Sequence, residues 1–268
     1  MRSNLMSRRA ALSGLLSMRI AIVGGTGTVG AEAARELEHR GHAVRVLSRH
    51  APEHAVDLRD GSGLAAALDG VDVVVNAANG NRNVLVDGTA RLLRAARDAG
   101  VRHYVGVSIV GIDRIGIRYY KAKLAQEELI QRSGVPWTIV RATQFHPFVA
   151  RTFAASAKLG IVPCLKFPMQ PVDPREVGRV LAETAEAEPS RAIAQFAGPE
   201  VVSGCELARR WRERTGSRAV PVRLPVTRAL RSGALTDPGA RRGGVTFDEW
   251  LDGGTIDDAV HPDMPRLP

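Results

Sequence analysis

The stretch RIAIVGGTGTVG, residues 19–30, carries the pattern that decides the fold. An apolar run typical of a buried strand ends in glycines spaced three apart, and a helix-like segment, 31–40, follows at once. Strand, glycine turn and helix in this order predict a dinucleotide site, because the backbone can approach a pyrophosphate at the positive end of the helix. The predicted phosphate-binding residues are Gly24, Thr26, Gly27, Thr28, Val29 and Gly30. A tight turn without a ligand is the alternative, since most dehydrogenases have Gly-x-Gly-x-x-Gly instead.

Strands and helices alternate beyond this turn. Apolar runs predict strands at 42–48, 55–60, 71–76, 101–108 and 137–141. Helical stripes separate these runs, so the sequence predicts an α/β fold, a Rossmann-type doubly wound parallel sheet.

The pattern changes after residue 142. A helix over 145–159 is expected to be interrupted by Pro147, and residues 161–172 are expected to be mostly extended. We therefore expect a dinucleotide-binding core over 18–145. A small C-terminal substrate lobe would cover most of 146–268, with some segments returning to the core.

The chain is basic, with a formal net charge of +9, and nearly all of its 37 Lys and Arg residues are arginines. These arginines are spread along the chain and no ladder of aromatic residues accompanies them, so we expect no nucleic-acid binding, although this class stays a hypothesis. No apolar run approaches the ~20 residues of a membrane-spanning helix, so no membrane partner is expected.

The two cysteines, Cys164 and Cys205, are far apart and are expected to stay unpaired, which favours a reducing cytoplasm. The seven histidines lack metal-ligand spacing, so no metal site is expected. Residues 1–17 resemble a twin-arginine export signal at Ser7–Leu12, but their apolar part is short and broken. We interpret 1–17 as a disordered extension or an upstream start-site artefact, with export as the alternative.

The tip of the second predicted strand carries a cofactor signal. In a dinucleotide fold an acid at this position binds the adenosine ribose of NAD, whereas an arginine pairs with the 2′-phosphate of NADP. Here the residue is Arg49, and the next acid is Glu53. The sequence therefore favours NADP over NAD, unless Arg49 is an ordinary exposed loop residue.

A Tyr-x-x-x-Lys pattern provides the candidate chemistry. Tyr119 and Lys123 are four apart on a predicted helix and would project from one face. The ammonium would lower the pKa of the phenol, so that the phenol exchanges a proton with a carbonyl oxygen during hydride transfer. Ser108, at the end of the fifth strand, would orient that oxygen. An amphipathic helix start without catalysis is the alternative.

Several segments together resemble the atypical short-chain dehydrogenase/reductases, and the NmrA-like, NAD(P)H-binding branch fits best. These segments are Gly24–Gly30, Asp87-Gly88-Thr89, Ser108–Gly111, Tyr119–Glu127, Trp137–His146, Gln170–Asp173 and Gly198-Pro199-Glu200. The resemblance implies that Asp57 and Leu58 hold the adenine and that Ala77 and Ala78 flank the adenosine. It also implies that Lys123 binds the nicotinamide ribose, and that Gln144 and Phe145 lie beside the nicotinamide.

Two functions remain open at this point. The first is an NADP(H)-dependent oxidoreductase acting on a small carbonyl or quinone-like substrate. The second is a non-catalytic NADP(H) sensor, because some NmrA-like relatives bind the cofactor without turnover. The adjacent Tyr120 leaves the identity of the acid open, and the sequence does not determine the substrate or the oligomeric state.

Overall fold

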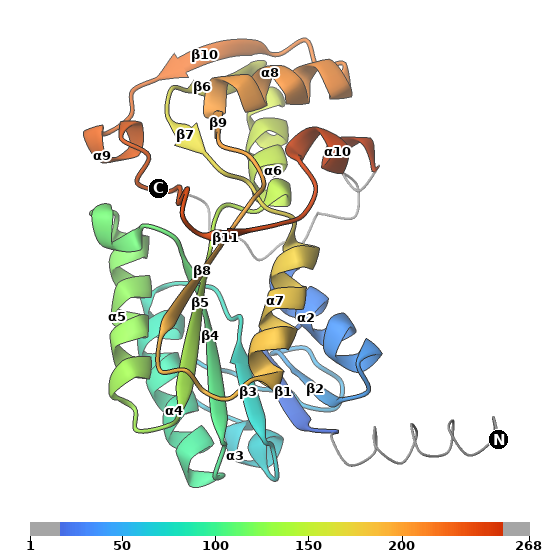
Figure 1. The fold of residues 1–268 in the computed structure, drawn as a ribbon, viewed down its shortest axis with the longest axis vertical. Helices are drawn as coiled ribbons and strands as arrows, with labels where there is room; N and C mark the ends of the chain where they lie inside the picture. Colours follow the sequence, from blue (N-terminus) through green and yellow to red (C-terminus); the bar gives the residue numbers. More distant parts are fainter. Residues whose placement is uncertain (1–16, 254–268) are drawn as a thin grey trace, which may run out of the picture.

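A parallel sheet with helices on both faces forms the lower part of the molecule (Figure 1). The computed structural model describes residues 17–253. The strand order is β2-β1-β3-β4-β5-β8-β11, and each adjacent pair is parallel. The strands are β1 (Arg19–Val23), β2 (Ala43–Leu47), β3 (Val73–Asn76), β4 (His103–Ile109), β5 (Trp137–Ala142), β8 (Ile193–Ala197) and β11 (Arg241–Arg242). The predicted doubly wound sheet is confirmed. Its order reverses between β1 and β3, where ligands of such sheets bind.

Two helical layers bury the sheet. The helices on one face are α2 (Thr28–His39) and α7 (Pro174–Glu186). Those on the other face are α3 (Leu64–Leu68), α4 (Thr89–Asp98) and α5 (Arg118–Arg132). Because both faces are covered, the central strands are apolar throughout, as all four residues of β3 are buried. A π-helical turn, η1 (Asn83–Gly88), leads into α4.

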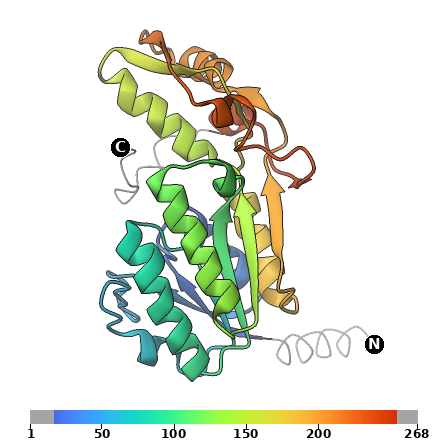
Figure 2. The same cartoon turned by 90° about the vertical axis from the view of Figure 1, so that its left-hand side faces the viewer.

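A smaller lobe lies beyond the carboxyl ends of the strands (Figures 1 and 2). Its elements are α6 (His146–Ala157), β6 (Ile161–Leu165), β7 (Pro168–Met169), β9 (Val202–Ser203), α8 (Gly204–Thr215), β10 (Val220–Leu224), α9 (Arg228–Arg231) and α10 (Phe247–Asp252). The lobe has its own apolar core, which includes Phe153, Trp211 and Phe247. The chain leaves this lobe once to form α7 and β8 in the main sheet domain and again to form β11.

Two local expectations are wrong. Residues 55–60 do not form a strand. Ala55 makes a single parallel β-bridge with Ser48, and residues 58–60 form a turn, because the Asp57 carboxylate accepts a hydrogen bond from the Arg59 backbone at 2.8 Å. Pro147 does not interrupt a helix. It lies in the first turn of α6, where the missing N–H costs nothing.

The expectation of two unpaired cysteines is also wrong. Cys164 in β6 and Cys205 in α8 form a disulfide, although 41 positions separate them. These two elements pack side by side in the lobe, a proximity that the sequence does not reveal. The interpretation of a reducing compartment depended on free thiols and loses this support.

Two further expectations concern the chain as a whole. The predicted N-terminal extension lies outside the described residues except for Ser17, whose hydroxyl donates to the Gly41 carbonyl at 3.0 Å. Within residues 17–253, each helix is too short or too polar to cross a bilayer.

Candidate cofactor and catalytic site

The glycine turn joins β1 to α2 with its backbone tightly folded. Gly24 has a φ of 76°, and its carbonyl accepts a hydrogen bond from the Gly27 N–H at 2.9 Å. A Cβ at Gly30 would lie only 2.2 Å from the Gly24 carbonyl oxygen. Gly27 caps α2 without a side chain, and an added Cβ there would meet only the Gly24 oxygen, at 3.2 Å. The turn thus leaves the first N–H groups of α2 open to an anion, as a pyrophosphate site requires.

The end of β3 lies directly against this turn. A Cβ on Gly24 would be 2.9 Å from the Cα of Ala78, so only glycine permits this approach. Asn76 shapes the chain here, because its side-chain oxygen accepts a hydrogen bond from the Ala78 N–H at 3.1 Å. Ala77 continues the strand pairing by donating to the Val23 carbonyl. Gly24, Ala77 and Ala78 therefore lie against one another where β1 and β3 end.

The residues predicted for the adenosine end lie near one another. Hydrogen bonding from the Arg59 backbone lowers the pKa of Asp57, and the positive charge of Arg49 lowers it further. Arg49 is thus close enough to Asp57 to interact with it. The Leu58 side chain is buried in the sheet core, so it offers little surface to an adenine ring.

The two adjacent tyrosines point into different surroundings. The Tyr119 hydroxyl donates to the side-chain oxygen of Asn79 at 2.8 Å, just beyond the end of β3. Tyr120 packs against the apolar core of the lobe. Their ring centroids are 5.7 Å apart. Of the two phenols, Tyr119 therefore lies nearer to the predicted cofactor crevice.

The pKa of Tyr119 contradicts the expectation of an activated phenol. Burial raises this pKa to about 12, the neighbouring Tyr120 adds to the rise, and the hydrogen bond to Asn79 opposes it. Lys123 does not lower this pKa, because its ammonium is directed elsewhere. The phenol is therefore protonated at neutral pH.

The Lys123 side chain extends from α5 towards β4, where two hydrogen bonds hold its ammonium. Its Nζ donates to the Val107 carbonyl and to the side-chain oxygen of Gln126, each at 2.8 Å. Burial lowers the pKa of Lys123 to about 8, an effect that the negative charge of Glu127 partly offsets. The backbone carbonyl of Val107 thus holds the Lys123 ammonium next to the position of Ser108, the predicted catalytic serine, in β4.

Ser108 lies near the end of β4 and is 4% exposed. Its hydroxyl oxygen is buried and has no hydrogen-bond partner among the described residues. A buried hydroxyl without a partner is costly, so its position favours a ligand that completes the bond.

Gln144 and Phe145 do not present free polar groups to a nicotinamide. The Gln144 amide donates to the Leu235 carbonyl at 2.8 Å, and its oxygen accepts from the Gln170 N–H at 3.1 Å. Phe145 packs with the apolar residues beneath α2 and α7. Gln144 therefore connects the lobe to the sheet.

A C-terminal segment, residues 233–245, covers the loops after β4 and β5. Besides the Gln144 contact, Arg114 in η2 (Ile112–Arg114) donates to the Thr236 carbonyl, and Gln170 accepts from the Asp237 N–H at 3.0 Å. A Cβ on Gly111 would lie 1.6 Å from the Ala234 carbonyl oxygen, so the loop after β4 depends on glycine at this contact.

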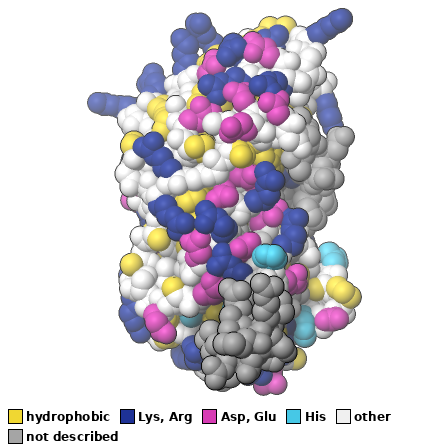
Figure 3. Space-filling view, turned by 45° about the vertical axis from the view of Figure 1, so that its right-hand side comes forward, with side chains coloured by type: hydrophobic (Ala, Val, Ile, Leu, Met, Phe, Trp, Pro, Cys, Tyr) yellow, Lys and Arg dark blue, Asp and Glu magenta, His cyan; other side chains and the backbone are white. Residues whose placement is uncertain are grey.

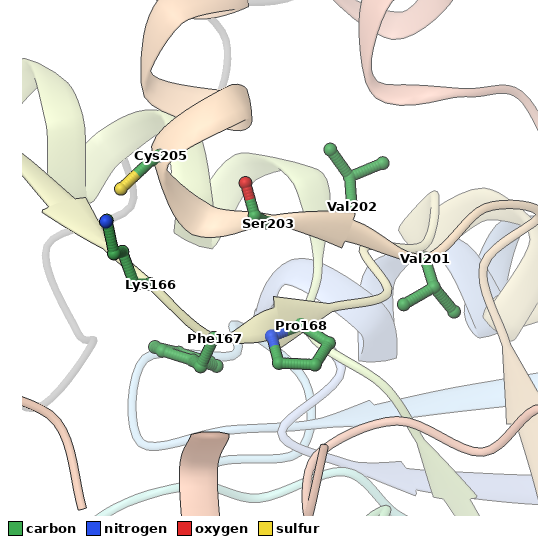
Figure 4. A pocket seen from close by; sticks show the side chains of 7 residues that line it. All are labelled: Lys166, Phe167, Pro168, Val201, Val202, Ser203 and Cys205. Atoms are coloured by element: carbon green, nitrogen blue, oxygen red, sulfur yellow. The ribbon is translucent and has the colours of Figure 1, made fainter. Parts of the chain in front are cut away.

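An open surface pocket of about 490 Å³ lies in the lobe, between the β6–β7 connection and the start of α8 (Figure 4). Its lining residues are Lys166, Phe167, Pro168, Val201, Val202, Ser203 and Cys205. None of the residues predicted for the cofactor or for catalysis belongs to this set.

Three arginines of α8, Arg209, Arg210 and Arg214, are paired with acids. Arg209 contacts Glu206 and Glu213, and Arg210 contacts Glu200 and Asp248. On the face shown in Figure 3, basic and acidic side chains are interspersed. This mixture does not resemble the continuous basic surface that nucleic-acid binding uses.

Sequence reasoning missed four polar residues of the site: Asn76, Asn79, Thr89 and Gln126. Asn76 and Asn79 lie at the carboxyl end of a central strand, where polar residues commonly face the ligand, so their position was a usable signal. Thr89 and Gln126 lie inside helices, and only the packing of α4 against α5 brings them together.

Comparisons with known proteins agree with this geometry. Residues 24–154 match the model of the NAD(P)H-binding family. The (4-alkanoyl-5-oxo-2,5-dihydrofuran-3-yl)methyl phosphate reductase of Streptomyces griseus is 33% identical over 204 residues, 70% of each chain. The NAD(P)H azoreductase of Xenophilus azovorans is 29% identical over 209 residues, 70% of this chain and 71% of that protein.

A solved structure supports the same fold. The NADPH-dependent quinone oxidoreductase of Escherichia coli, in complex with NADPH, superposes with a TM-score of 0.70 at 15% identity, covering 87% of this chain and 99% of the other. With the glycine turn, the strand order and the sequence relatives taken together, the chain belongs to the NAD(P)H-binding family of atypical short-chain dehydrogenase/reductases and is an NAD(P)H-dependent oxidoreductase.

Proposed function

We propose that the protein transfers hydride between NADP(H) and a small carbonyl or quinone-like substrate. One observation carries this proposal. Ser108, a buried hydroxyl without a partner within residues 17–253, lies near the end of β4, and the Tyr119 phenol reaches the end of the neighbouring strand β3. The carboxyl ends of adjacent strands meet at one edge, where a carbonyl oxygen could contact both groups.

Each residue has a defined part in this reaction. A bound nicotinamide supplies or accepts the hydride. Ser108 donates a hydrogen bond to the substrate oxygen and orients it. During reduction, Tyr119 gives its proton to that oxygen while the carbonyl carbon gains the hydride, and the phenolate then recovers a proton from water. The phenol begins each cycle protonated, although its raised pKa makes it a weaker acid than an ordinary tyrosine. Lys123 binds the nicotinamide ribose.

The cofactor preference is a separate part of the proposal. Arg49, next to Asp57 at the adenosine end, would pair with the 2′-phosphate of NADP. We expect Arg49→Gln to raise the dissociation constant of NADPH about tenfold and to leave that of NADH nearly unchanged. Equal losses for both cofactors would contradict this assignment.

The substrate class draws on the relatives. The Streptomyces griseus enzyme acts on an unsaturated lactone phosphate, and the Escherichia coli structure is of a quinone oxidoreductase. Conjugated carbonyl compounds are common to both. The test is NADPH oxidation with a panel of quinones, unsaturated lactones and aldehydes, comparing the native protein with Tyr119→Phe and with Tyr120→Phe as matched control. We expect turnover to fall about 100-fold in Tyr119→Phe and to change little in the control.

The alternative, an NADP(H) sensor without turnover, disagrees with the reductase relatives, but one arrangement in the structure would also fit it. The Tyr119 hydroxyl donates its hydrogen bond to the Asn79 side chain, and the Lys123 ammonium donates to Val107 and Gln126 instead of the phenol. A sensor predicts tight NADPH binding with no oxidation by any compound of the panel.

A further inference from the structure

A chain of buried polar side chains lies behind Lys123. The Lys123 ammonium donates to the Gln126 oxygen at 2.8 Å, and the Gln126 Nε2 donates to the Thr89 hydroxyl at 2.9 Å. Asn76 Nδ2 reaches the same hydroxyl at 3.4 Å and the Tyr104 hydroxyl at 2.7 Å. All five side chains are at most 5% exposed. Such a network is maintained only if its members satisfy one another, because an unpaired polar group at this depth is costly.

The hydrogen bonds fix the orientation of the Gln126 amide. An ammonium has only donors, so it must face the amide oxygen, Oε1. The amide nitrogen is then directed at Thr89, whose hydroxyl oxygen accepts its hydrogen bond. Reversing the amide would place two donors against each other at Lys123, so Gln126 holds a single orientation. Gln126 thereby provides a fixed acceptor beneath the lysine.

The far end of this chain reaches the glycine turn that is predicted to bind the cofactor. Asn76 uses its oxygen to accept the Ala78 N–H at 3.1 Å, and Ala78 packs directly against Gly24 of the glycine turn. The polar chain therefore takes its side chains from four elements, β3, β4, α4 and α5. It connects the backbone beside the predicted pyrophosphate site with the ammonium beneath the predicted nicotinamide site.

We propose that Gln126, held by Thr89, positions the Lys123 ammonium for the cofactor. Val107 and Gln126 occupy two of the three N–H donors of this ammonium among the described residues, which leaves one donor for a ribose hydroxyl. Gln126 touches neither cofactor nor substrate in this arrangement, so it is a positioning residue. The inference rests on the proposed role of Lys123 in binding the ribose.

The charges around Lys123 determine how its protonation responds to changes at Gln126. The negative charge of Glu127, on the same helix, raises the pKa of Lys123. The Glu127 carboxylate also forms an ion pair with Arg141 of β5 at 2.7 Å. Tyr104 of β4 and Tyr119 of α5 are both neutral phenols, since burial raises their pKa values. Removing the Gln126 oxygen would thus lower the pKa of Lys123, and a carboxylate in its place would raise it.

The test is NADPH binding, followed by cofactor fluorescence from about pH 6 to pH 10. In Gln126→Leu we expect about tenfold weaker binding at neutral pH, and the loss of affinity with rising pH should begin at a lower pH. In Gln126→Glu the loss should begin at a higher pH. Thr89→Ser should bind like the native protein, and Thr89→Val should resemble Gln126→Leu. The matched control is Gln131→Leu, an exposed glutamine on the same helix.

Two results separate the possible failures. If Lys123→Met binds NADPH as tightly as the native protein, the proposed role of Lys123 is wrong. If Lys123→Met weakens binding but both Gln126 variants keep the native pH profile, the positioning role alone is overturned. Thermal unfolding of each variant completes the comparison, because a purely structural role would lower the melting temperature without moving the pH profile in opposite directions.

Discussion

Gly27 and Gly30 are glycine for different reasons. Replacing each with alanine should therefore have different effects on stability and on NADPH binding. The Cβ of Gly30→Ala would lie 2.2 Å from the Gly24 carbonyl oxygen and 3.0 Å from the Gly25 Cα, all of it backbone that cannot rotate away. The Cβ of Gly27→Ala would meet one atom at 3.2 Å, a distance that a shift of a few tenths of an ångström relieves. Gly30 thus serves packing, whereas at Gly27 we predict that the missing side chain leaves room for the pyrophosphate.

The magnitudes follow from these contacts. Forcing a carbon into a packed site costs about 1–3 kcal/mol or more, so Gly30→Ala should lower the melting temperature by at least about 3–8 °C. Gly27→Ala should cost less than about 1 kcal/mol, since φ at this position is −84° and suits any residue. It should nevertheless weaken NADPH binding by about tenfold or more, because the added methyl group blocks the approach of the pyrophosphate.

Thermal unfolding without cofactor and NADPH titration by fluorescence measure the two effects separately. Gly116→Ala is the matched control, because its Cβ would meet nothing within 4 Å and its backbone is not left-handed. The reasoning would be refuted if Gly27→Ala bound NADPH as tightly as the native protein while keeping its fold. Native stability in Gly30→Ala would refute the packing argument on its own.

Three further predictions concern stability. Replacing Cys164 or Cys205 with serine should lower the free energy of unfolding by about 4 kcal/mol, measured with urea, because the loop they close spans 41 positions; an unchanged value would mean that the bond does not restrict the unfolded chain. The pKa of Lys123 is 10.5 when unfolded and about 8 when folded, so its contribution should make the protein more stable as pH rises through this interval; Lys123→Met should flatten that rise, and an identical pH dependence would contradict the burial. Glu127→Gln should cost about 1–3 kcal/mol by removing the closer carboxylate of Arg141, which keeps only the exposed Asp113 at 3.5 Å, and adding Arg141→Met should recover part of this loss in the same urea assay.

Local sequence signals predicted the parts of the fold that local chemistry determines. The strand-turn-helix at 19–39 and the helix that begins near Tyr119 follow from patterns within a few residues. The strand expected at 55–60 was wrong because a single side chain, Asp57, bonds its own backbone and makes turns. Burial of Leu58 gave the segment its apolar character without a strand.

The candidate site shows where sequence reasoning stops. Tyr119 and Lys123 could be selected from their spacing, but the pKa of the phenol depends on burial by distant segments, and its direction was opposite to the expectation. Gln144 was predicted beside the nicotinamide. Its side-chain amide forms hydrogen bonds with the backbone of residues 170 and 235. The disulfide likewise depends on tertiary packing of β6 against α8.

The route of the chain between its two parts has a practical consequence for engineering. Helix α7 packs along α2, and β8 pairs with β5, although residues on both sides of this segment belong to the lobe. A hybrid made at one junction near residue 145 would therefore import a foreign α7 and β8 into a sheet that did not evolve with them. Exchange of substrate specificity between relatives should succeed only when residues 170–197 stay with their own sheet and the flanking lobe segments are grafted separately.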